Sequence, residues 1–230
     1  MTKLYTHDVT TVLRRLPIHV RDQLKKVGPG LFVAGGFIRS CVANEVPSDI
    51  DLFSPSKHWA EAYAKELAEK AAVKIWESDN AFTVHLTPWP AQYIHRWTFE
   101  RPEDAMASFD FTVAQAAIWW TGETWTSMCS ERFYADLAAR RLVYLRPQRN
   151  EDAGGSMLRV LKFYTKGYRI PLDSLGAVIS RLVQGVKPDD ESQRRFLRDP
   201  EWRDQLLTSL LIEVDPNSDP SKYIMEPTND

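Results

Sequence analysis

One short pattern constrains the fold more than any other feature of the sequence. It consists of the glycines Gly35 and Gly36, Arg39 three residues later, and a pair of aspartates that begins ten residues after the arginine. Residues 31–34 form a short apolar run that predicts a strand. The pattern over residues 37–44 predicts a helix that begins directly after Gly35 and Gly36. The N–H groups at a helix start have no partner within the helix, and glycines let a ligand approach the backbone. Both features favour the binding of an anion. This corner is predicted to bind phosphate, with Arg39 adding a charge-assisted hydrogen bond.

The two aspartates, Asp49 and Asp51, alternate with apolar residues as in a strand. Successive strand side chains point to opposite faces, so these two carboxylates share one face. Carboxylates held that close repel each other unless a cation lies between them. Mg²⁺ (or Mn²⁺) is the expected cation, because it takes one or two carboxylates with phosphate oxygens and water, and can assist a phosphoryl displacement. Together the two halves predict nucleotidyl transfer from a nucleoside triphosphate (NTP).

The joint pattern GG-x-x-R followed by D-x-D resembles the first motif of the nucleotidyltransferase superfamily that includes DNA polymerase beta. The nearest subgroup is the head of bacterial tRNA CCA-adding enzymes and poly(A) polymerases, and the resemblance covers about residues 31–170. It implies an α+β fold with a mixed sheet and flanking helices. It also implies that a nucleoside monophosphate is transferred to an acceptor hydroxyl at the 3′ end of an RNA or tRNA. A simple turn with two solvated acids would leave the spacing unexplained.

Two alternating runs, residues 81–86 and 92–99, predict a hairpin after the Asp49–Asp51 strand. In the family that the sequence resembles, a strand in this region supplies a third acid to the metal site. Aligning residues 94–99 with the family's run places His95 at that position. A histidine can coordinate a metal, although imidazole suits softer ions better than Mg²⁺. The alternatives are a strand histidine hydrogen-bonded beside the site, or another alignment in which Glu100 or Glu77 is the acid.

Residues 103–113 resemble the family's segment in which two arginines precede Asp-Phe-Thr. The Asp-Phe-Thr that begins at Asp110 matches, whereas Ser108 and Phe109 replace the arginines. Losing two guanidiniums removes two bidentate phosphate donors, which predicts altered nucleotide choice or weaker binding. Asp110 is expected either to contribute to the nucleotide site or to cap a helix over residues 111–118.

Residues 156–170 resemble the family's Arg-x-Leu-Arg helix, and Arg159 and Lys162 match its basic residues. The resemblance implies that both approach the triphosphate from the side opposite the glycine corner. An ordinary solvated amphipathic helix explains the same pattern. The apolar stripe of this helix is predicted to comprise Met157, Leu158, Leu161 and Tyr164.

Composition limits the function and location of the protein less strictly than the motifs do. The formal net charge of −2 and the pI near 6.2 exclude a general basic field, so nucleic-acid binding would need a local basic patch. Cys41 and Cys129 form no metal-ligand spacing and no disulfide framework. The N-terminus resembles no signal peptide and no apolar run is long enough to cross a membrane, which predicts a cytoplasmic protein without a membrane partner.

We expect three parts: a nucleotidyltransferase head over residues 1–145, a helical neck-like part over 146–212 and an extended or disordered tail over 213–230. The head is expected to begin with two helical pieces broken near Pro17 and to contain a hairpin with Gly122 in its turn. The neck-like part is expected to contain a helix that begins at Pro171, followed by helical stretches 190–198 and 200–212. The inner face of the first of these helices is predicted to comprise Leu172, Leu175, Val178, Ile179 and Leu182.

A second interpretation is a degenerate head that binds a nucleotide or RNA without turnover. Ser40 in place of the family's acid, His95 and the lost arginine pair favour it. The intact pair Asp49 and Asp51 disfavours it, because an inactive site has no physical need for two adjacent carboxylates. A protein or small-molecule acceptor is a further alternative for an active enzyme.

Overall fold

The computed structural model describes residues 1–147, 154–184, 195 and 198–205. The chain divides into two compact units, residues 1–139 (unit 1) and 140–230 (unit 2). The predicted tail over 213–230, and most of the predicted helices 190–198 and 200–212, lie outside the described residues.

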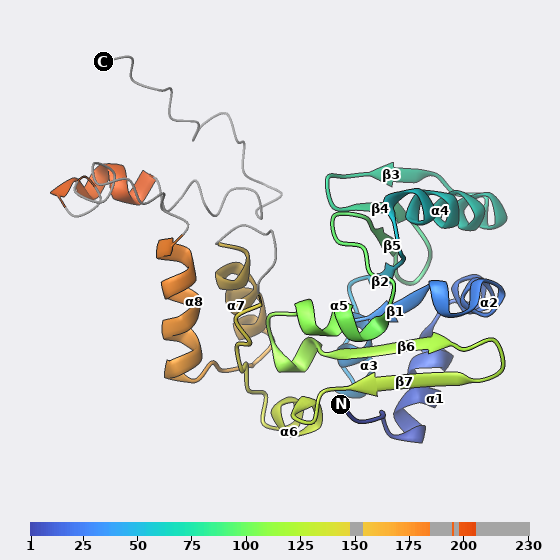
Figure 1. The fold of residues 1–230 in the computed structure, drawn as a ribbon, viewed down its shortest axis with the longest axis horizontal. Coiled ribbons are helices and arrows are strands. Elements are labelled where there is room, and N and C mark those ends of the chain that lie inside the picture. The colour runs from blue at the N-terminus through green and yellow to red at the C-terminus, as the bar shows by residue number, and fades with distance from the viewer. Residues whose placement is uncertain (148–153, 185–194, 196–197, 206–230) are drawn as a thin grey trace, which may run out of the picture. The chain divides into compact units, whose positions relative to one another are not determined.

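Unit 1 contains one seven-stranded sheet with the order β3-β4-β5-β2-β1-β6-β7 (Figure 1). Its strands are β1 (Phe32–Ala34), β2 (Ile50–Phe53), β3 (Ile75–Glu77), β4 (Ala81–Val84), β5 (Ala91–Ile94), β6 (Ala116–Trp120) and β7 (Trp125–Cys129). Strands β2 and β5 are parallel, and the other neighbouring pairs are antiparallel. A mixed sheet with flanking helices confirms the predicted α+β fold class.

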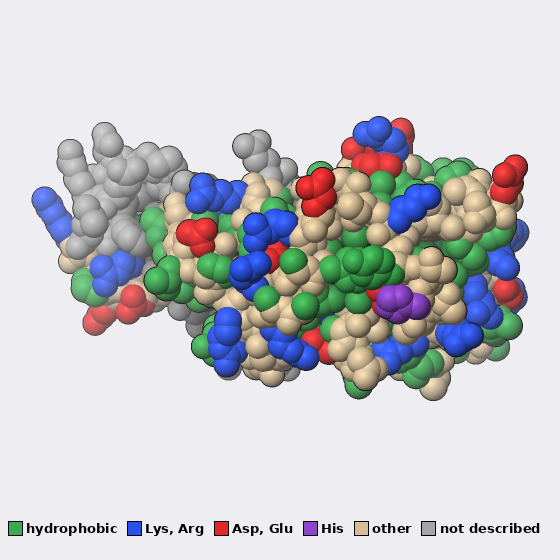
Figure 2. All heavy atoms as spheres, turned by 90° about the horizontal axis from the view of Figure 1, so that it is seen from below, with side chains coloured by type: hydrophobic (Ala, Val, Ile, Leu, Met, Phe, Trp, Pro, Cys, Tyr) green, Lys and Arg blue, Asp and Glu red, His purple; other side chains and the backbone are tan. Residues whose placement is uncertain are grey.

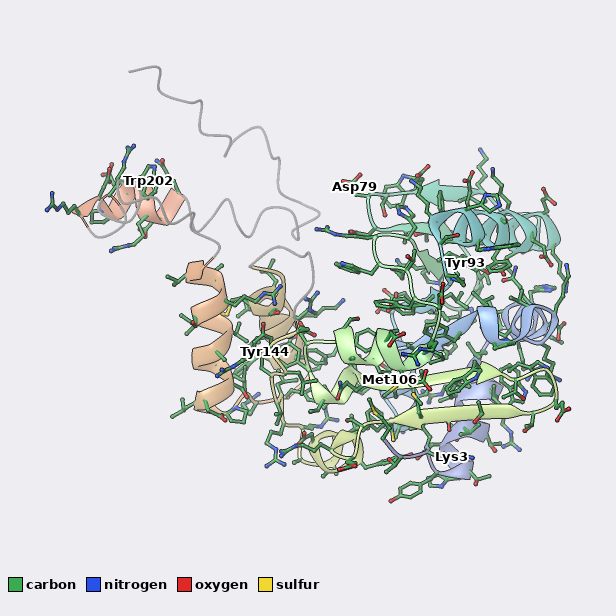
Figure 3. All side chains as sticks on the ribbon, viewed as in Figure 1. Lys3, Asp79, Tyr93, Met106, Tyr144 and Trp202 are labelled. Carbon is green, nitrogen blue, oxygen red and sulfur yellow. The ribbon has the colours of Figure 1, made fainter. Side chains whose placement is uncertain are left out.

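Three helices pack with one face of this sheet: α2 (Ile18–Val27), α3 (Gly36–Val42) and α4 (Lys57–Ala71). The helix α1 (Thr6–Arg15) packs on α3. The break between α1 and α2 falls at Pro17, as predicted, because proline has no N–H to continue the helix. Apolar side chains at helical spacing on α1 and α2, including Val12, Val20 and Leu24, are fully buried. On the sheet, Tyr93 of β5 points to this side, since its hydroxyl hydrogen-bonds to Gln23 of α2 (Figure 3).

The opposite face of the sheet carries α5 (Pro102–Ser108), which packs against β1 and β6. Met106 of α5 is fully buried there, in one apolar cluster with Phe32 and Phe53 (Figure 3). Side chains alternate along β2, so Asp51 lies on the same face as Phe53, whereas Leu52 points to the helices α2–α4. This is the face that carries the predicted site.

The predicted hairpin is confirmed. Strands β6 and β7 pair with Trp120 opposite Trp125, whose rings meet edge-on at 5.4 Å, and Gly122 takes a φ of +103° in the turn. The helix predicted over residues 111–118 is wrong. A short 3₁₀ helix, η2 (Thr112–Ala114), is followed directly by β6, because pairing with both β1 and β7 favours the extended backbone that Ile118 and the tryptophans also prefer.

A buried hydrogen bond ties η2 to the helix α6 (Phe133–Ala138). The Asp136 carboxylate is fully buried, accepts a hydrogen bond from Thr112 Oγ1 at 2.7 Å, and pairs with Arg132 Nε at 3.1 Å. Removing the Thr112 hydroxyl would take this hydrogen bond from a buried carboxylate, and such a loss typically costs about 1–3 kcal/mol. This contact therefore fixes the segment that follows α5.

Unit 2 contains α7 (Gly155–Thr165) and α8 (Leu172–Gln184). The predicted stripe of α7 is wrong at two positions, since Leu161 and Tyr164 are about half exposed; Ser156, Val160 and Phe163 are buried instead. On α8 the predicted inner face is confirmed at Val178, which is buried, and is wrong at Leu172 and Ile179, which are exposed. The error on α7 is a rotation of the buried face about the helix axis, which periodicity alone does not fix. None of the described helices is long and apolar enough to cross a membrane.

Candidate active site

The glycine corner joins β1 to α3. Strand β1 ends at Ala34, and α3 begins at Gly36. Gly35 takes a φ of +85°, which side-chain-bearing residues rarely adopt, and its N–H donates to Ala116 O at 2.9 Å. The predicted strand, turn and helix are therefore present, although α3 ends at Val42 rather than two residues later.

Asp51 lies beside this corner. Strands β1 and β2 are antiparallel with Val33 opposite Leu52, so the same register places Asp51 across from Ala34. Asp51 Oδ2 is 4.0 Å from the position that a Cβ atom on Gly35 would take. The structure thus brings together the glycines and the second aspartate, which are sixteen residues apart along the chain.

Asp49 directly precedes β2, and its Oδ1 accepts a hydrogen bond from Ser48 Oγ at 3.0 Å. Both aspartates are partly exposed, so ions and substrates can reach them. Among the described residues, no group of three or more His, Cys, Asp or Glu side chains could hold a metal. Two carboxylates fit Mg²⁺ or Mn²⁺, whose remaining ligands would come from substrate and water.

Arg39, the predicted phosphate donor, is buried on α3. Its side chain is 8% exposed, its Nη2 donates to Ser40 Oγ at 2.9 Å, and its Nε lies 3.8 Å from Glu45 Oε2. An Arg39 Nη1 atom lies 3.8 Å from the position of a Cβ on Gly36. The guanidinium thus lies under the glycine corner, where it offsets the charge of Glu45.

Cys41 lies on the same helix, α3. Burial raises the pKa of its thiol to about 11, so the reactive thiolate is scarce near neutral pH. Nucleophilic chemistry at the Cys41 thiol is accordingly disfavoured.

Gln92 is a neighbour of Asp51 that the sequence reasoning did not identify. In the parallel pair of β2 and β5, Asp51 lies opposite Gln92, and Gln92 lies opposite Thr83 of β4. These three side chains therefore share one face of the sheet, in one row. The alternation of side chains around Gln92 indicates a strand. It does not reveal that Gln92 lies beside Asp51, because that depends on the register between two strands that are about forty residues apart.

His95 lies elsewhere. It follows the end of β5, its Nε2 is 3.1 Å from Ser78 O, and its ring packs on Phe82 at 4.7 Å. Phe82 pairs with Tyr93, so it points to the face of the helices α2–α4 rather than to the face of Asp51.

The surroundings of His95 form a separate open pocket of about 530 Å³. It is lined by Lys57, Glu77, Ser78, Asp79 and His95. Figure 3 shows Asp79 at the outer end of the β3–β4 hairpin. Glu77, the alternative third acid, belongs to this pocket as well, where it pairs with Lys57 at 2.9 Å. Glu100 is exposed in the loop before α5.

The segment after α5 returns to the glycine corner. The Phe109 ring comes within 3.4 Å of the Cβ position on Gly35, and Asp110 directly after it is 3% exposed. Arg159 and Lys162 lie on α7 of unit 2, with Arg159 partly buried and Lys162 exposed. Lysine and arginine side chains occur at many places on the face in Figure 2, with acidic side chains among them.

Solved structures of CCA-adding enzymes share this fold. The Thermotoga maritima CCA-adding enzyme complexed with tRNA matches at a TM-score of 0.56 and 15% identity, over 94% of this chain and 52% of that chain. A CCA-adding enzyme with CTP matches at 0.53 and 16%, over 91% and 67%. One with ATP matches at 0.52 and 16%, over 91% and 56%. The chain spans about half the length of the first. These matches confirm the resemblance to a nucleotidyltransferase fold.

A search of curated proteins found no match. The model of the Gabija anti-defense 2 family matches residues 5–140, which is more than half of the chain and nearly all of unit 1. The chain therefore belongs to the Gabija anti-defense 2 family.

Proposed function

We propose that this protein is a metal-dependent nucleotidyltransferase that moves a nucleoside monophosphate from an NTP to an acceptor hydroxyl. One observation carries the proposal: Asp51 Oδ2 lies 4.0 Å from the position that a Cβ atom on Gly35 would take. The fold around this contact is shared with CCA-adding enzymes. A carboxylate that can hold a cation thus lies beside a turn that can admit phosphate. Transfer of a phosphoryl group depends chiefly on such positioned charge.

In the proposed reaction the acceptor oxygen attacks the α-phosphorus, the bond to the β-phosphate breaks, pyrophosphate leaves and the hydroxyl proton passes to solvent. Asp49 and Asp51 would hold Mg²⁺ or Mn²⁺, which when bound stabilises charge on the phosphoryl oxygens. The backbone at Gly35 and Gly36 would face the phosphates. Arg39 would hold that turn in place and add positive charge beneath it.

The remaining predicted residues have supporting roles in this proposal. Asp110 would keep the segment after α5 at the corner, because it is almost fully buried directly after Phe109. Arg159 and Lys162, on the helical part that we propose as a neck, would assist with the triphosphate. Replacing either with methionine is expected to raise the NTP concentration needed for half-maximal rate, with a smaller effect on the maximal rate.

We propose an RNA 3′ end as the acceptor. Solved structures of this fold include a CCA-adding enzyme complexed with tRNA and others with CTP or ATP. The family description adds a context of anti-defense against Gabija, in which modification of an RNA would be the protein's means of action.

A second candidate, a head that binds nucleotide without turnover, is favoured by one observation. The row beside Asp51 continues with the uncharged Gln92 and Thr83, so no third carboxylate lies in this row of the described sheet. A weaker cation site would lower the rate more than it lowers nucleotide binding.

The test incubates the protein with each labelled NTP, Mg²⁺ or Mn²⁺, and total RNA. Wild type is compared with Asp49→Ala/Asp51→Ala. The matched control is Glu77→Ala/Asp79→Ala, which removes two acids at the same spacing from the pocket around His95. We expect label in RNA with wild type and the control, and none with the aspartate variant. Label that persists in the aspartate variant would contradict the proposed site, and nucleotide binding without transfer to RNA, protein or small molecules would favour the second candidate.

A further inference from the structure

The Phe109 ring lies in the glycine corner beside Asp51. Its Cζ and Cε1 atoms are 3.4 Å and 3.6 Å from the position of a Cβ on Gly35, and Asp51 Oδ2 is 4.0 Å from the same position. The ring and the carboxylate therefore flank one small region of the sheet surface. The ring is partly exposed, so a bound molecule can reach it.

Packing holds the ring in this place from several sides. The N–H of Phe109 donates to the carbonyl of the buried Met106 at 3.2 Å, which fixes the end of α5. Phe53 of β2 meets the ring edge-on, with centroids 6.0 Å apart. On the other side of the segment, Thr112 is hydrogen-bonded to the buried Asp136. The ring is thus a fixed part of the corner.

An aromatic ring in this place does not suit phosphate. Phosphate oxygens are bound by N–H donors and cations, which a benzyl group lacks. A nucleoside has a flat base, and every base can stack on an aromatic side chain because every base has a π face. When the phosphates of a substrate are held at Asp51, the ring lies within reach of the adjoining nucleoside.

We propose that Phe109 is a substrate-binding residue that contacts the nucleoside of the incoming nucleotide. This inference rests on the proposed function and deepens it, because it assigns the apolar part of the substrate to a named side chain. In the family that this segment resembles, arginines at this position would contact phosphate. In this protein, contact with the nucleoside would supply the binding free energy instead. The site accordingly binds an NTP more tightly than it binds a polyphosphate of the same charge.

The test is equilibrium binding of two probes, measured by calorimetry with Mg²⁺ present. The first probe is α,β-methylene-ATP, which carries a base and cannot release pyrophosphate, and the second is inorganic tripolyphosphate, which has no nucleoside. Phe109→Leu keeps an apolar side chain without a π face. The matched control is Phe99→Leu, because Phe99 packs on Phe53 in the same cluster, with centroids 5.9 Å apart.

We expect Phe109→Leu to bind the nucleotide about tenfold more weakly, within the range measured for base–aromatic stacking. Its affinity for tripolyphosphate should be unchanged, and Phe99→Leu should match wild type for both probes. Phe109→Trp keeps a larger π face and should bind the nucleotide at least as tightly as wild type, which keeps the test decisive if the leucine variant unfolds.

Equal nucleotide affinity of wild type and Phe109→Leu would overturn the inference and leave the proposed function in place. Tighter binding of both probes by Phe109→Leu would also overturn it, since the ring would then be an obstacle in the corner. Equal loss of both probes from a folded variant would overturn it by showing that the ring shapes the phosphate site. No Mg²⁺-dependent binding of either probe by wild type would overturn the proposed function together with the inference.

Discussion

Asp51 and His95 lie on or directly after neighbouring parallel strands, yet they belong to different regions of the sheet. Asp51 shares a row with Gln92 and lies 4.0 Å from the Cβ position on Gly35. His95 contacts Ser78 and Phe82, in a pocket with Lys57. The difference teaches that strand register and strand face, rather than residue type or order along the chain, decide which side chains share a site.

The largest expected difference between the two regions is in catalysis. Asp51→Asn keeps the side-chain shape and removes its charge, and should lower metal-dependent transfer by about a hundredfold or more, because the ion contributes several kcal/mol of charge stabilisation. His95→Asn should leave the rate unchanged. Initial rates of label incorporation at saturating NTP and Mn²⁺ measure both, and equal losses would show that the two regions form one site.

This comparison also separates what the sequence predicts from what it does not. The Gly35 turn and the shared face of Asp49 and Asp51 are local, because a strand–turn–helix sequence and two-residue alternation depend only on nearby residues. The placement of His95 depends on the pairing of residues 91–94 with residues 50–53, which is not local. The alignment of residues 94–99 with the family's run therefore does not determine the face of the sheet on which His95 lies.

The secondary structure shows the same difference between local features, which the sequence predicts, and features that depend on distant residues. The break at Pro17 and the turn at Gly122 are set by single residues, and both are present. The helix expected over residues 111–118 is replaced by β6, since two neighbouring strands pair with this segment. On α7 the buried face is rotated, and such a rotation depends on partners that periodicity does not reveal.

The second prediction tests the glycine corner. Gly35→Ala and Gly122→Ala both place a side chain at positive φ, which costs about 1–3 kcal/mol of unfolding free energy in each variant. Only Gly35 has neighbours within 4 Å, namely Phe109 and Asp51; Gly122 has none among the described residues. Gly35→Ala should therefore also weaken nucleotide binding, by about tenfold or more, since small displacements at a site are costly.

Urea denaturation and calorimetric nucleotide titration measure the two effects separately. Unchanged nucleotide affinity in Gly35→Ala would remove this corner from the site. A similar loss in Gly122→Ala would attribute the effect to general destabilisation instead.

The third prediction uses the register directly. Gln92→Glu places a carboxylate beside Asp51, and should tighten Mn²⁺ binding about fivefold, which corresponds to roughly 1 kcal/mol of added attraction in a partly solvated site. His95→Glu adds the same charge in the other region and should leave Mn²⁺ affinity unchanged. Thr98→Glu, at an exposed position, controls for total charge. The reverse ranking of the first two variants would restore His95 as the position beside the metal.

The smallest expected effect concerns the pocket around His95. Lys57 pairs with Glu77 at 2.9 Å, and both side chains are more than half exposed. Lys57→Met should change the free energy of unfolding by less than about 1 kcal/mol, because exposed ion pairs are screened by water and salt. It should leave transfer unchanged. A large loss of activity in a stable variant would mean that this pocket takes part in the reaction.

The most direct test of the central claim is a Mn²⁺ titration followed by electron paramagnetic resonance, with wild type, Asp51→Asn and His95→Ala side by side. The account predicts that wild type and His95→Ala bind Mn²⁺ with the same affinity, more tightly in the presence of α,β-methylene-ATP. It predicts that Asp51→Asn loses this binding while it unfolds at the same temperature as wild type. Retained Mn²⁺ binding in Asp51→Asn, or its loss in His95→Ala, would contradict the assignment of the metal site to the glycine corner.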